Sequence, residues 1–378
     1  MFVRSLHVHE FRNYQELRLA LGHRPVVLTG PNGAGKTNIL EALSLLSPGR
    51  GLRRAARRDF PRQGMVSPLG QDVSVTTPWS IYAKLETEAG PLEVGTGIQP
   101  DKLDGARAVR LNGVKSNLGQ LASYFAVSWL TPQMDGLFIG SPSSRRRFVD
   151  RLAIAFDPAH SGRLSRYEKL YRERQRLIQE GGNDDSWLSA LETQLAETGM
   201  AIMAARAALT RAVSEAAYQS DAHLGFPRLH MAMTGGGCAW LDDMPALAAE
   251  DKMKETARAR RQAGDLSMPG PQAQDLTTIH LDKGQPAQLA STGEQKALMI
   301  AAILAHARLQ AGRLDRPPLL LLDDVAAHLD EEKRHCLFAA TSELKGQVWY
   351  SGTDRVAFSA MNQFAQFFNV SQGQIEPQ

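Results

Sequence analysis

The octapeptide GPNGAGKT, Gly30 to Thr37, combines three glycines, a lysine and a threonine at the spacing G-x-x-x-x-G-K-[ST]. Glycines let the backbone turn its N–H groups around a phosphate, the lysine can neutralise the β and γ oxygens, and the threonine hydroxyl can bind Mg²⁺. A strand pattern, PVVLTG, precedes the octapeptide and a helical pattern, TNILEALSLL, follows it, as a phosphate-binding loop requires. We therefore predict a site for ATP and Mg²⁺ that includes Gly30, Pro31, Asn32, Gly33, Ala34, Gly35, Lys36, Thr37 and Asn38.

An acidic pair, Asp323 and Asp324, follows four consecutive leucines. The leucines predict a buried strand, and ligands of α/β sheets bind at the carboxyl ends of the strands. An acidic pair after a leucine run is by itself more often a plain strand end, but the octapeptide favours a functional role. We expect Asp323 to bind Mg²⁺ through water, together with Thr37, and Asp324 to orient or deprotonate the attacking water.

The stretch STGEQKALMI, Ser291 to Ile300, allows two interpretations. Ser291 and Glu294 fit a capping box, whereas Ser291, Gly293 and Gln295 at a helix start could also contact a phosphate. The order of octapeptide, S-x-G-x-Q, strand with two acids, and HLD (328–330) is that of the ATP-binding-cassette ATPases. In that class the serine–glycine element contacts ATP held by a second subunit, so we expect both roles and an ATP-dependent homodimer. Gln133 in TPQMD stands near the place of the Q-loop glutamine and joins Lys36 and Asp324 as a catalytic candidate.

Arginines gather in GRGLRRAARRDFPR (49–62) and in SSRRRF (143–148). A single cluster of this kind is commonly a solvated face. Such clusters are also typical of phosphate-rich partners, and six or more phosphate contacts would give salt-dependent, sequence-tolerant binding to DNA. The residues that we assign to DNA are Arg53, Arg54, Arg57, Arg58, Arg145 and Arg146.

The surrounding patterns predict the elements that position these groups. Short strands and one helix are expected in the first 45 residues, a β-rich region from about 66 to 130, and helices from about 143 to 220 with a turn at GGNDDS (181–186). Strands return at DLTTIHL, PPLLLLDD, QVWYSG and QFFNV. We predict an α/β fold, an ATP-binding-cassette-type ATPase head with a mixed sheet, formed by residues 1–142 and 266–378 with a helical arm domain (143–265) inserted.

Composition excludes several classes of protein. The 378 residues are 43% hydrophobic and 22% charged with a net charge of +3, and no apolar run approaches the roughly 18 residues of a membrane span. The amino terminus lacks the apolar centre of a secretory signal, so we expect a cytoplasmic protein with no membrane partner. Cys238 and Cys336 show neither a disulfide framework nor metal-ligand spacing.

Together these motifs resemble the RecF family of bacterial recombination mediators, ATPases related to SMC proteins. The resemblance rests on EFRNY (10–14), the octapeptide, GSPSSRRRFVD (140–150), LETQLAETGMAIMAAR (191–206) and the two carboxy-terminal motifs, and it extends from residue 2 to about 373. The family's G-P-H-R-x-D element reads GPQAQD here (270–275). The switch histidine of transporters has no match either, and Thr353 and Asp354 are the nearest candidates.

The resemblance implies a head that dimerises on ATP and grips duplex DNA at single-strand gaps. It implies slow, DNA-stimulated ATP hydrolysis that releases the dimer, and RecR and RecO as partners in loading RecA. Two alternatives are the ATPase subunit of a membrane transporter and an SMC-like tether. The arginine clusters and the arm count against the first, and an insert of about 120 residues is too short for the long coiled coil of the second.

Overall fold

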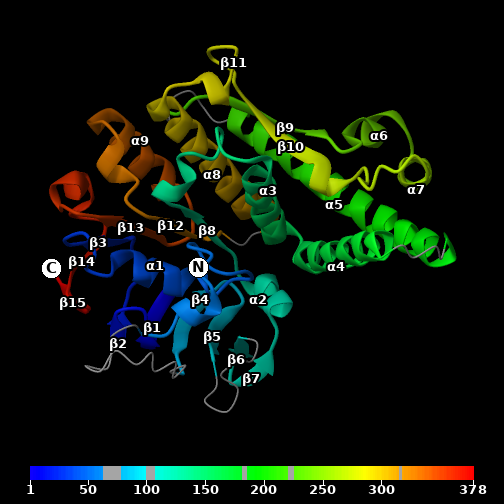
Figure 1. Cartoon of the computed structure of the whole chain (residues 1–378). Coiled ribbons are helices and arrows are strands. Elements are labelled where there is room, and N and C mark those ends of the chain that lie inside the picture. Colours follow the sequence, from blue (N-terminus) through cyan, green and yellow to red (C-terminus); the bar gives the residue numbers. More distant parts are fainter. Residues whose placement is uncertain (63–77, 99–106, 181–184, 220–224, 315–316) are drawn as a thin grey trace, which may run out of the picture. The chain divides into compact units, whose positions relative to one another are not determined.

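The computed structural model describes residues 1–62, 78–98, 107–180, 185–219, 225–314 and 317–378 (Figure 1). The chain divides into two compact units. The first unit comprises Met1–Met134, Asp221–Phe226 and His306–Gln378, and the second comprises Asp135–Ser220 and Pro227–Ala305. Both ends of the chain thus belong to the first unit. The predicted boundaries of the arm domain, 143–265, stay a prediction.

Two six-stranded sheets form the framework of the first unit. One is antiparallel, in the order β2-β1-β4-β5-β6-β7, with β1 (Phe2–Phe11), β2 (Tyr14–Ala20), β4 (Ser80–Thr87), β5 (Gly90–Gly97), β6 (Ala108–Leu111) and β7 (Val114–Ser116). The other has the order β15-β14-β3-β13-β12-β8, with β3 (Val26–Thr29), β8 (Val127–Leu130), β12 (Leu319–Leu322), β13 (Val348–Gly352), β14 (Gln366–Ser371) and β15 (Gln374–Pro377). In the second sheet β15 is antiparallel to β14, and all the other pairs are parallel.

The helices of this unit are α1 (Lys36–Ser44), α2 (Leu118–Tyr124), α9 (Glu331–Ser342) and the last part of α8 (Thr292–Leu314), with short 3₁₀ turns at η1 (Arg57–Asp59), η2 (Pro132–Met134), η6 (Ala326–His328) and η7 (Val356–Met361). Helix α1 lies between the two sheets (Figure 1). Its apolar side chains Ile39, Leu40 and Leu43 are fully buried in one core with side chains of β1, β4 and β3. Burial of each such side chain contributes about 1.5–3 kcal/mol, so the helix is firmly fixed behind the loop that precedes it.

The parallel strands bring three distant segments to one edge of the second sheet. Leu322 pairs with Tyr350 and Leu130, and Thr29 pairs with Gly352 and Asn369. Since parallel strands end at the same edge, the octapeptide after β3 and the acidic pair after β12 emerge side by side.

A three-stranded antiparallel sheet and several helices make up the second unit. The sheet has the order β11-β10-β9, with β9 (Leu229–Gly235), β10 (Gln274–His280) and β11 (Gln285–Pro286). The helices are α3 (Pro142–Phe156), α4 (Ala159–Gln179), α5 (Asp185–Gln219), α6 (Cys238–Asp243), α7 (Ala246–Gln262) and the first part of α8, with η4 (Pro271–Ala273) and η5 (Ala287–Leu289). Helices α4 and α5 run side by side (Figure 1), and Tyr167, Leu195, Met203 and Met253 belong to a core that α4, α5 and α7 share.

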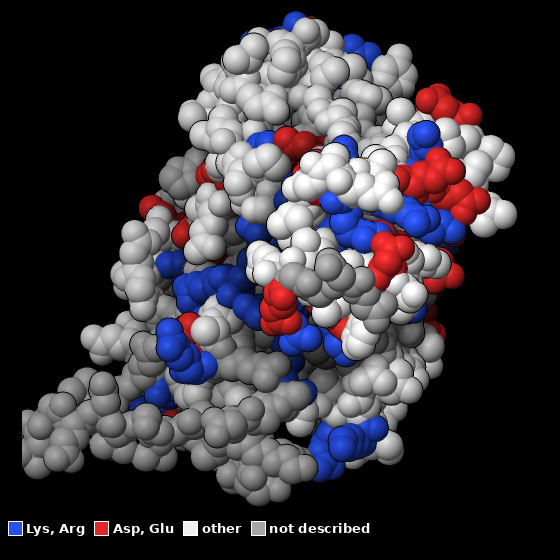
Figure 2. All heavy atoms as spheres, turned by 45° about the vertical axis from the view of Figure 1, so that its right-hand side comes forward, with Lys and Arg blue, Asp and Glu red and all other residues white. Residues whose placement is uncertain are grey.

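The predicted α/β architecture is confirmed, and the predicted strands around the octapeptide and the acidic pair are β1, β2, β3, β12, β13 and β14. Parts of the predicted β-rich region, 66–77 and 99–106, and part of the turn at GGNDDS lie outside the described residues. Within the described ranges, no helix combines the length and apolar character that a membrane crossing needs. Basic side chains form several separate groups on the face in Figure 2, some of them beside acidic ones, so each arginine has to be placed individually.

Candidate functional site

The octapeptide adopts a loop in which two glycines, Gly30 and Gly35, are required by both their backbone conformation and their close packing. Gly30 has φ 143° and Gly35 has φ 117°, in the region that L side chains rarely adopt. A Cβ on Gly30 would lie 2.1 Å from the Val370 carbonyl oxygen, and one on Gly35 would lie 2.5 Å from side-chain atoms of Asn13 and Tyr14. The loop therefore packs closely on its surroundings. At Gly33, by contrast, a Cβ would meet nothing within 4 Å, so this part of the loop faces open space.

Lys36 begins α1 and folds back over the loop. Its Nζ donates hydrogen bonds to the carbonyl oxygens of Gly30 at 2.6 Å and Pro31 at 2.9 Å. Burial lowers the pKa of this ammonium group, and the charges of Asp324 and Asp323 partly offset the effect. The lysine is thus held where a phosphate in the loop would meet a positive charge.

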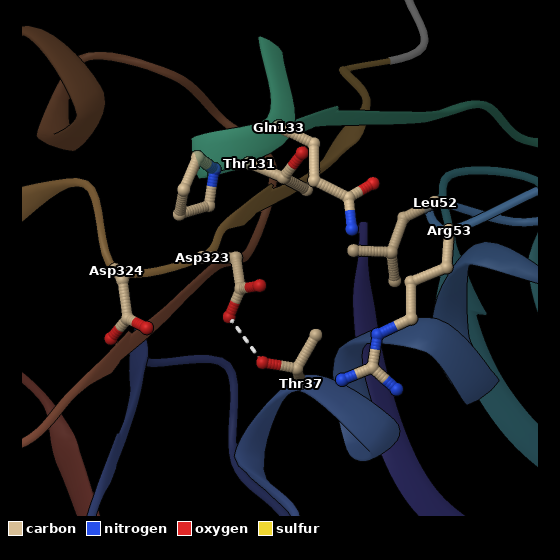
Figure 3. Close-up of a pocket in the computed structure, with 8 residues that line it drawn as sticks. Thr37, Leu52, Arg53, Thr131, Gln133, Asp323 and Asp324 are labelled. Atoms are coloured by element: carbon tan, nitrogen blue, oxygen red, sulfur yellow. Dashed lines mark hydrogen bonds between the residues drawn. The ribbon is translucent and has the colours of Figure 1, made fainter. Parts of the chain in front are cut away.

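The acidic pair meets the loop at Thr37. The Thr37 hydroxyl donates to Asp323 Oδ1 at 2.9 Å, the bond drawn as a dashed line in Figure 3. The Asp323 main-chain N–H donates to the Leu130 carbonyl oxygen in the neighbouring strand, which fixes the residue at the strand end. Burial raises the pKa of the Asp323 carboxyl, while hydrogen bonds from Ser351 and Thr37 oppose this shift.

These groups line a cavity of about 230 Å³. Figure 3 shows Asp324, Asp323, Thr37 and Arg53 in succession across it, with Gln133 above them. Its lining consists of Thr37, Leu52, Arg53, Thr131, Pro132, Gln133, Asp323 and Asp324. The structure therefore brings together the predicted Thr37, Gln133, Asp323 and Asp324, which lie up to 287 positions apart, 324 − 37.

Oxygen donors in this cavity fit Mg²⁺ that is shared with a phosphate. Mg²⁺ usually takes one or two carboxylates, waters and substrate phosphates instead of an all-protein cage. Thr37 and Asp323 offer such oxygens, and one buried carboxylate oxygen of Asp324, Oδ1, has no hydrogen-bond partner among the described residues. The described part of the chain holds no cluster of three or more His, Cys, Asp or Glu suited to a metal.

The turn between β1 and β2 supports the loop, a role that the sequence prediction did not assign. Asn13 donates to the Ala34 carbonyl oxygen at 3.1 Å and accepts a hydrogen bond from the Asn38 side chain at 2.6 Å. Beside it, Arg12 forms a two-bonded ion pair with Glu41 of α1, with both distances 2.8 Å. The sequence feature that could have indicated this role is the segment EFRNY. The sequence prediction used it only as part of the family resemblance and gave it no physical role.

Arg53 was predicted to contact DNA, but its guanidinium lies in the cavity wall. It donates to Asn38 Oδ1 at 2.5 Å and lies 3.5 Å from the buried carboxylate of Glu41. Arg58 is 90% exposed, Arg54 is exposed, and the Arg57 side chain lies outside the described residues. In this first cluster Arg54 and Arg58 therefore remain accessible candidates for DNA contact.

Intramolecular contacts hold the two arginines of the second cluster that were assigned to DNA, Arg145 and Arg146. Arg145 is 7% exposed and donates to both carboxylate oxygens of Asp275 at 2.7 Å and to the carbonyl oxygens of Phe138 and Gly140. Arg146 donates to the Gln274 carbonyl oxygen at 2.7 Å. These contacts favour a structural role for Arg145, and the assignment of both residues to DNA stays a prediction.

A complete capping box forms at Ser291. The Ser291 N–H donates to Glu294 Oε2 at 2.8 Å, and the Glu294 N–H donates to Ser291 Oγ at 3.4 Å. Hydrogen bonds from Lys283 and from Ser291 lower the pKa of Glu294 to about 2. Ser291 and Gly293 are exposed, whereas Gln295 is buried and donates to the Ala290 carbonyl oxygen. The helix start thus presents two of its three predicted contact residues to solvent.

Comparison with known proteins gives the family of the chain. The family model of the RecF/RecN/SMC N-terminal domain matches residues 2–376. DNA replication and repair protein RecF of Brucella suis biovar 1 is 45% identical over 377 residues, which cover 99% of this chain and 95% of that protein. The RecF protein of Rhizobium rhizogenes is 43% identical over 382 residues, which cover 99% and 98% of the two chains.

Two solved structures share the fold. A structure of the recombination mediator protein RecF-ATPrS in the RecFOR pathway superposes with a TM-score of 0.83 at 19% identity, covering 100% of this chain and 98% of that chain. An Smc head bound to the C-winged helix domain of ScpA gives a TM-score of 0.54 at 15% identity, covering 100% and 97%. With a match over nearly its whole length and relatives at 45% identity, the chain belongs to the RecF family of DNA replication and repair proteins.

Proposed function

We propose that this protein is an ATP-dependent DNA-binding clamp in recombinational repair and in the recovery of replication forks. The observation that carries the proposal is the cavity in which Thr37 of the glycine-rich loop contacts Asp323 of the acidic pair. A loop that can surround phosphates and an acid that can hold their metal are the two halves of an ATP site. Solved RecF structures described as RecF-ATP and RecF-ATPrS support this proposal.

In this function the glycine-rich loop and four cavity residues, Thr37, Gln133, Asp323 and Asp324, have distinct tasks. The N–H groups of the loop from Gly30 to Asn38 bind the phosphates, and Lys36 neutralises their β and γ oxygens. Thr37 and Asp323 hold Mg²⁺, which supplies charge neutralisation at the phosphates when bound. Gln133 and Asp324 orient the attacking water, and Asp324 accepts its proton. Hydrolysis is slow and DNA-stimulated, and it serves to release the clamp.

The second half of each ATP site comes from a second copy of the chain. Ser291 and Gly293 of the partner contact the γ-phosphate, which explains why both are exposed at a helix start, whereas the buried Gln295 supports that start through its hydrogen bond to the Ala290 carbonyl oxygen. ATP binding therefore drives formation of a homodimer. Because a two-fold axis repeats the arrangement, the dimer contains two such sites.

The ATP-bound dimer grips DNA near single-strand gaps. Its contacts are made chiefly to phosphates by exposed arginines such as Arg54 and Arg58, so binding tolerates many sequences. RecR and RecO are its partners in loading RecA. The RecF structures from the RecFOR pathway and the family membership of the chain support this partner set.

Sedimentation tests the ATP-dependent dimer. With ATP, Mg²⁺ and gapped duplex DNA, the wild-type chain is expected to change from monomer to dimer, whereas Lys36→Met stays monomeric. Lys115→Met removes an exposed lysine of β7 and is the matched control, which is expected to dimerise as the wild type does. Dimerisation that is the same in Lys36→Met and the wild type would refute the proposal.

A further inference from the structure

Ser351 is a buried hydroxyl that the function proposed above does not use. It lies in β13, between β12 and β3, and only 1% of the residue is exposed. In the parallel register Leu322 pairs with Tyr350, so the next residues along, Asp323 and Ser351, are neighbours at the strand ends. Strand pairing thus fixes the position of this hydroxyl relative to the acidic pair.

One hydroxyl contacts both acids of the pair. Ser351 Oγ donates to Asp323 Oδ1 at 2.6 Å and accepts a hydrogen bond from the Asp324 main-chain N–H at 3.0 Å. Asp323 Oδ1 also accepts the Thr37 hydroxyl, so this carboxylate is held from α1 on one side and from β13 on the other. Its orientation depends on both hydroxyl groups.

The second contact matters because the Asp324 backbone is strained. Asp324 has φ 51°, in the left-handed region that residues other than glycine seldom occupy. This conformation directs a residue that follows a buried strand toward the cavity, where Figure 3 shows its carboxylate. A hydrogen bond to the Asp324 N–H helps to hold the backbone in this conformation.

We infer that Ser351 is a positioning residue for the hydrolysis site. Its hydroxyl holds the Asp323 carboxylate and the Asp324 backbone in the geometry that the reaction needs. The inference rests on the ATP site proposed above. Ser351 lies within β13. The two residues that the sequence suggested in place of the switch histidine, Thr353 and Asp354, follow that strand. Thr353 is exposed, and the Asp354 carboxylate accepts the Val356 N–H at the start of η7.

Ser351→Ala tests the inference because it removes the hydroxyl and adds no bulk. Loss of a residue that orients a metal ligand typically lowers metal affinity or activity about 10–100-fold. We expect kcat for ATP hydrolysis to fall by this order, and the Mg²⁺ concentration for half-maximal activity to rise. The affinity for the fluorescent analogue mant-ATP, measured in EDTA, should stay within about twofold of wild type, since Lys36 and the glycine loop are unchanged.

Two further variants separate positioning from packing. Ser351→Thr keeps a hydroxyl on the same carbon and is expected to recover most of kcat. Ser128→Ala is the matched control, because it removes a buried hydroxyl from β8 of the same sheet whose contacts are with His306 and Gln310, at 3.5 and 3.4 Å. It should leave kcat and the Mg²⁺ requirement near those of the wild type.

The outcomes distinguish the inference from the function on which it rests. If Ser351→Ala hydrolyses ATP within about twofold of the wild-type rate, or if Ser128→Ala lowers kcat equally, Ser351 has no positioning role. If Ser351→Ala weakens mant-ATP binding in EDTA but leaves kcat unchanged, the hydroxyl stabilises the folded phosphate-binding loop and does not position the acidic pair. A wild-type chain that neither binds nor hydrolyses ATP would instead remove the proposed function itself.

Discussion

Two roles are open to the Arg53 guanidinium, contact with DNA and contact with ATP. The sequence shows this residue as one of six arginines in a basic segment, and such a segment is typical of DNA contact. In the structure, the Asn38 side chain and the buried Glu41 carboxylate draw the same side chain into the cavity beside Thr37. Its charge therefore lies where the phosphates of ATP are proposed to bind, away from the exposed Arg58.

Arg53→Ala is accordingly expected to weaken ATP binding or hydrolysis. A hydrogen bond to a charged group contributes about 1.5–3 kcal/mol, so the loss in kcat/KM should be roughly 10–150-fold. Arg58→Ala is the comparison, and it should leave kcat/KM unchanged while reducing the salt dependence of DNA binding by about one unit of slope. Steady-state ATPase assays and DNA titrations over a salt series measure both. If Arg53→Ala affected DNA binding alone, the original assignment from sequence would be right.

The burial of Asp323 predicts the sign of a pH dependence in the stability of the nucleotide-free protein. Burial raises its folded-state pKa above the unfolded value of about 3.9, so ionisation of this carboxyl opposes folding. The wild type loses this part of its stability as the pH rises through the folded-state pKa. Asp323→Asn does not ionise, so its melting temperature without Mg²⁺ should exceed that of the wild type at pH 7–8, and the difference should shrink toward pH 4. A difference that grows as the pH falls would contradict the burial argument.

Helix α3 buries one arginine of a charged cluster that the sequence suggested as a surface patch. Ser141 caps the helix by accepting the Ser144 N–H, and Pro142 occupies the first turn. Arg145, Phe148, Val149 and Leu152 then follow the spacing i, i+3, i+4 and i+7 of a single helix face, and all four are buried. This spacing was legible in the sequence. The sequence prediction did not use this spacing, because it interpreted the three neighbouring arginines by their charge and not by their positions on a helix.

The same helix carries a buried ion pair that links it to α5. Arg206 donates to both carboxylate oxygens of Asp150, at 2.7 and 2.8 Å, and to the Pro271 carbonyl oxygen and the Gln274 side chain. Burial raises the pKa of Asp150, but hydrogen bonds from His160 and Arg206 outweigh it and keep that pKa below its usual value. The segment GPQAQD, which differs from the family's G-P-H-R-x-D element, thus makes structural contacts through its backbone, through Gln274 and through Asp275.

Asp150→Ala is expected to destabilise the second unit by about 3–5 kcal/mol, because it leaves the Arg206 guanidinium buried without its counter-charge. Asp242→Ala removes one partner of an exposed pair with Arg211, 3.5 Å apart, and should cost less than about 1 kcal/mol. Hydrogen exchange of α5 amides reports on this unit by itself. Equal effects of the two variants would show that the buried pair contributes little.

At the scale of the whole chain, the order of elements was predictable and part of the second unit was not. Glycine spacing, leucine runs and the acidic pair predicted β3, α1 and β12, since each has a strong local pattern. Strand β9, LHMAMTG, has Thr234 as its single β-branched residue and is defined by its pairing with β10, which lies about 40 residues later. Arg53 contacts Asn38 and Glu41, which lie 15 and 12 residues earlier in α1, and Ser351 contacts Asp323, 28 residues earlier. Because these contacts join different elements, sequence alone could not assign the two roles.

The proposed dimer predicts that two inactive chains can restore each other. Each ATP site combines Lys36 of one chain with Ser291 of the other, so Lys36→Met and Ser291→Arg damage opposite halves. In the mixed dimer one site receives both defects and the other receives none. Lys36→Met chains do not dimerise with each other, so the recovery comes from mixed dimers, each with one intact site of two, and ATP hydrolysis should reach at most roughly half of the wild-type rate. Mixing Lys36→Met with Asp323→Asn is the matched control, because both changes lie in the same half of the site and no mixed dimer has an intact site. Recovery in the first mixture alone requires a site shared between chains, whereas no recovery in either mixture would mean that Ser291 does not complete its partner's site.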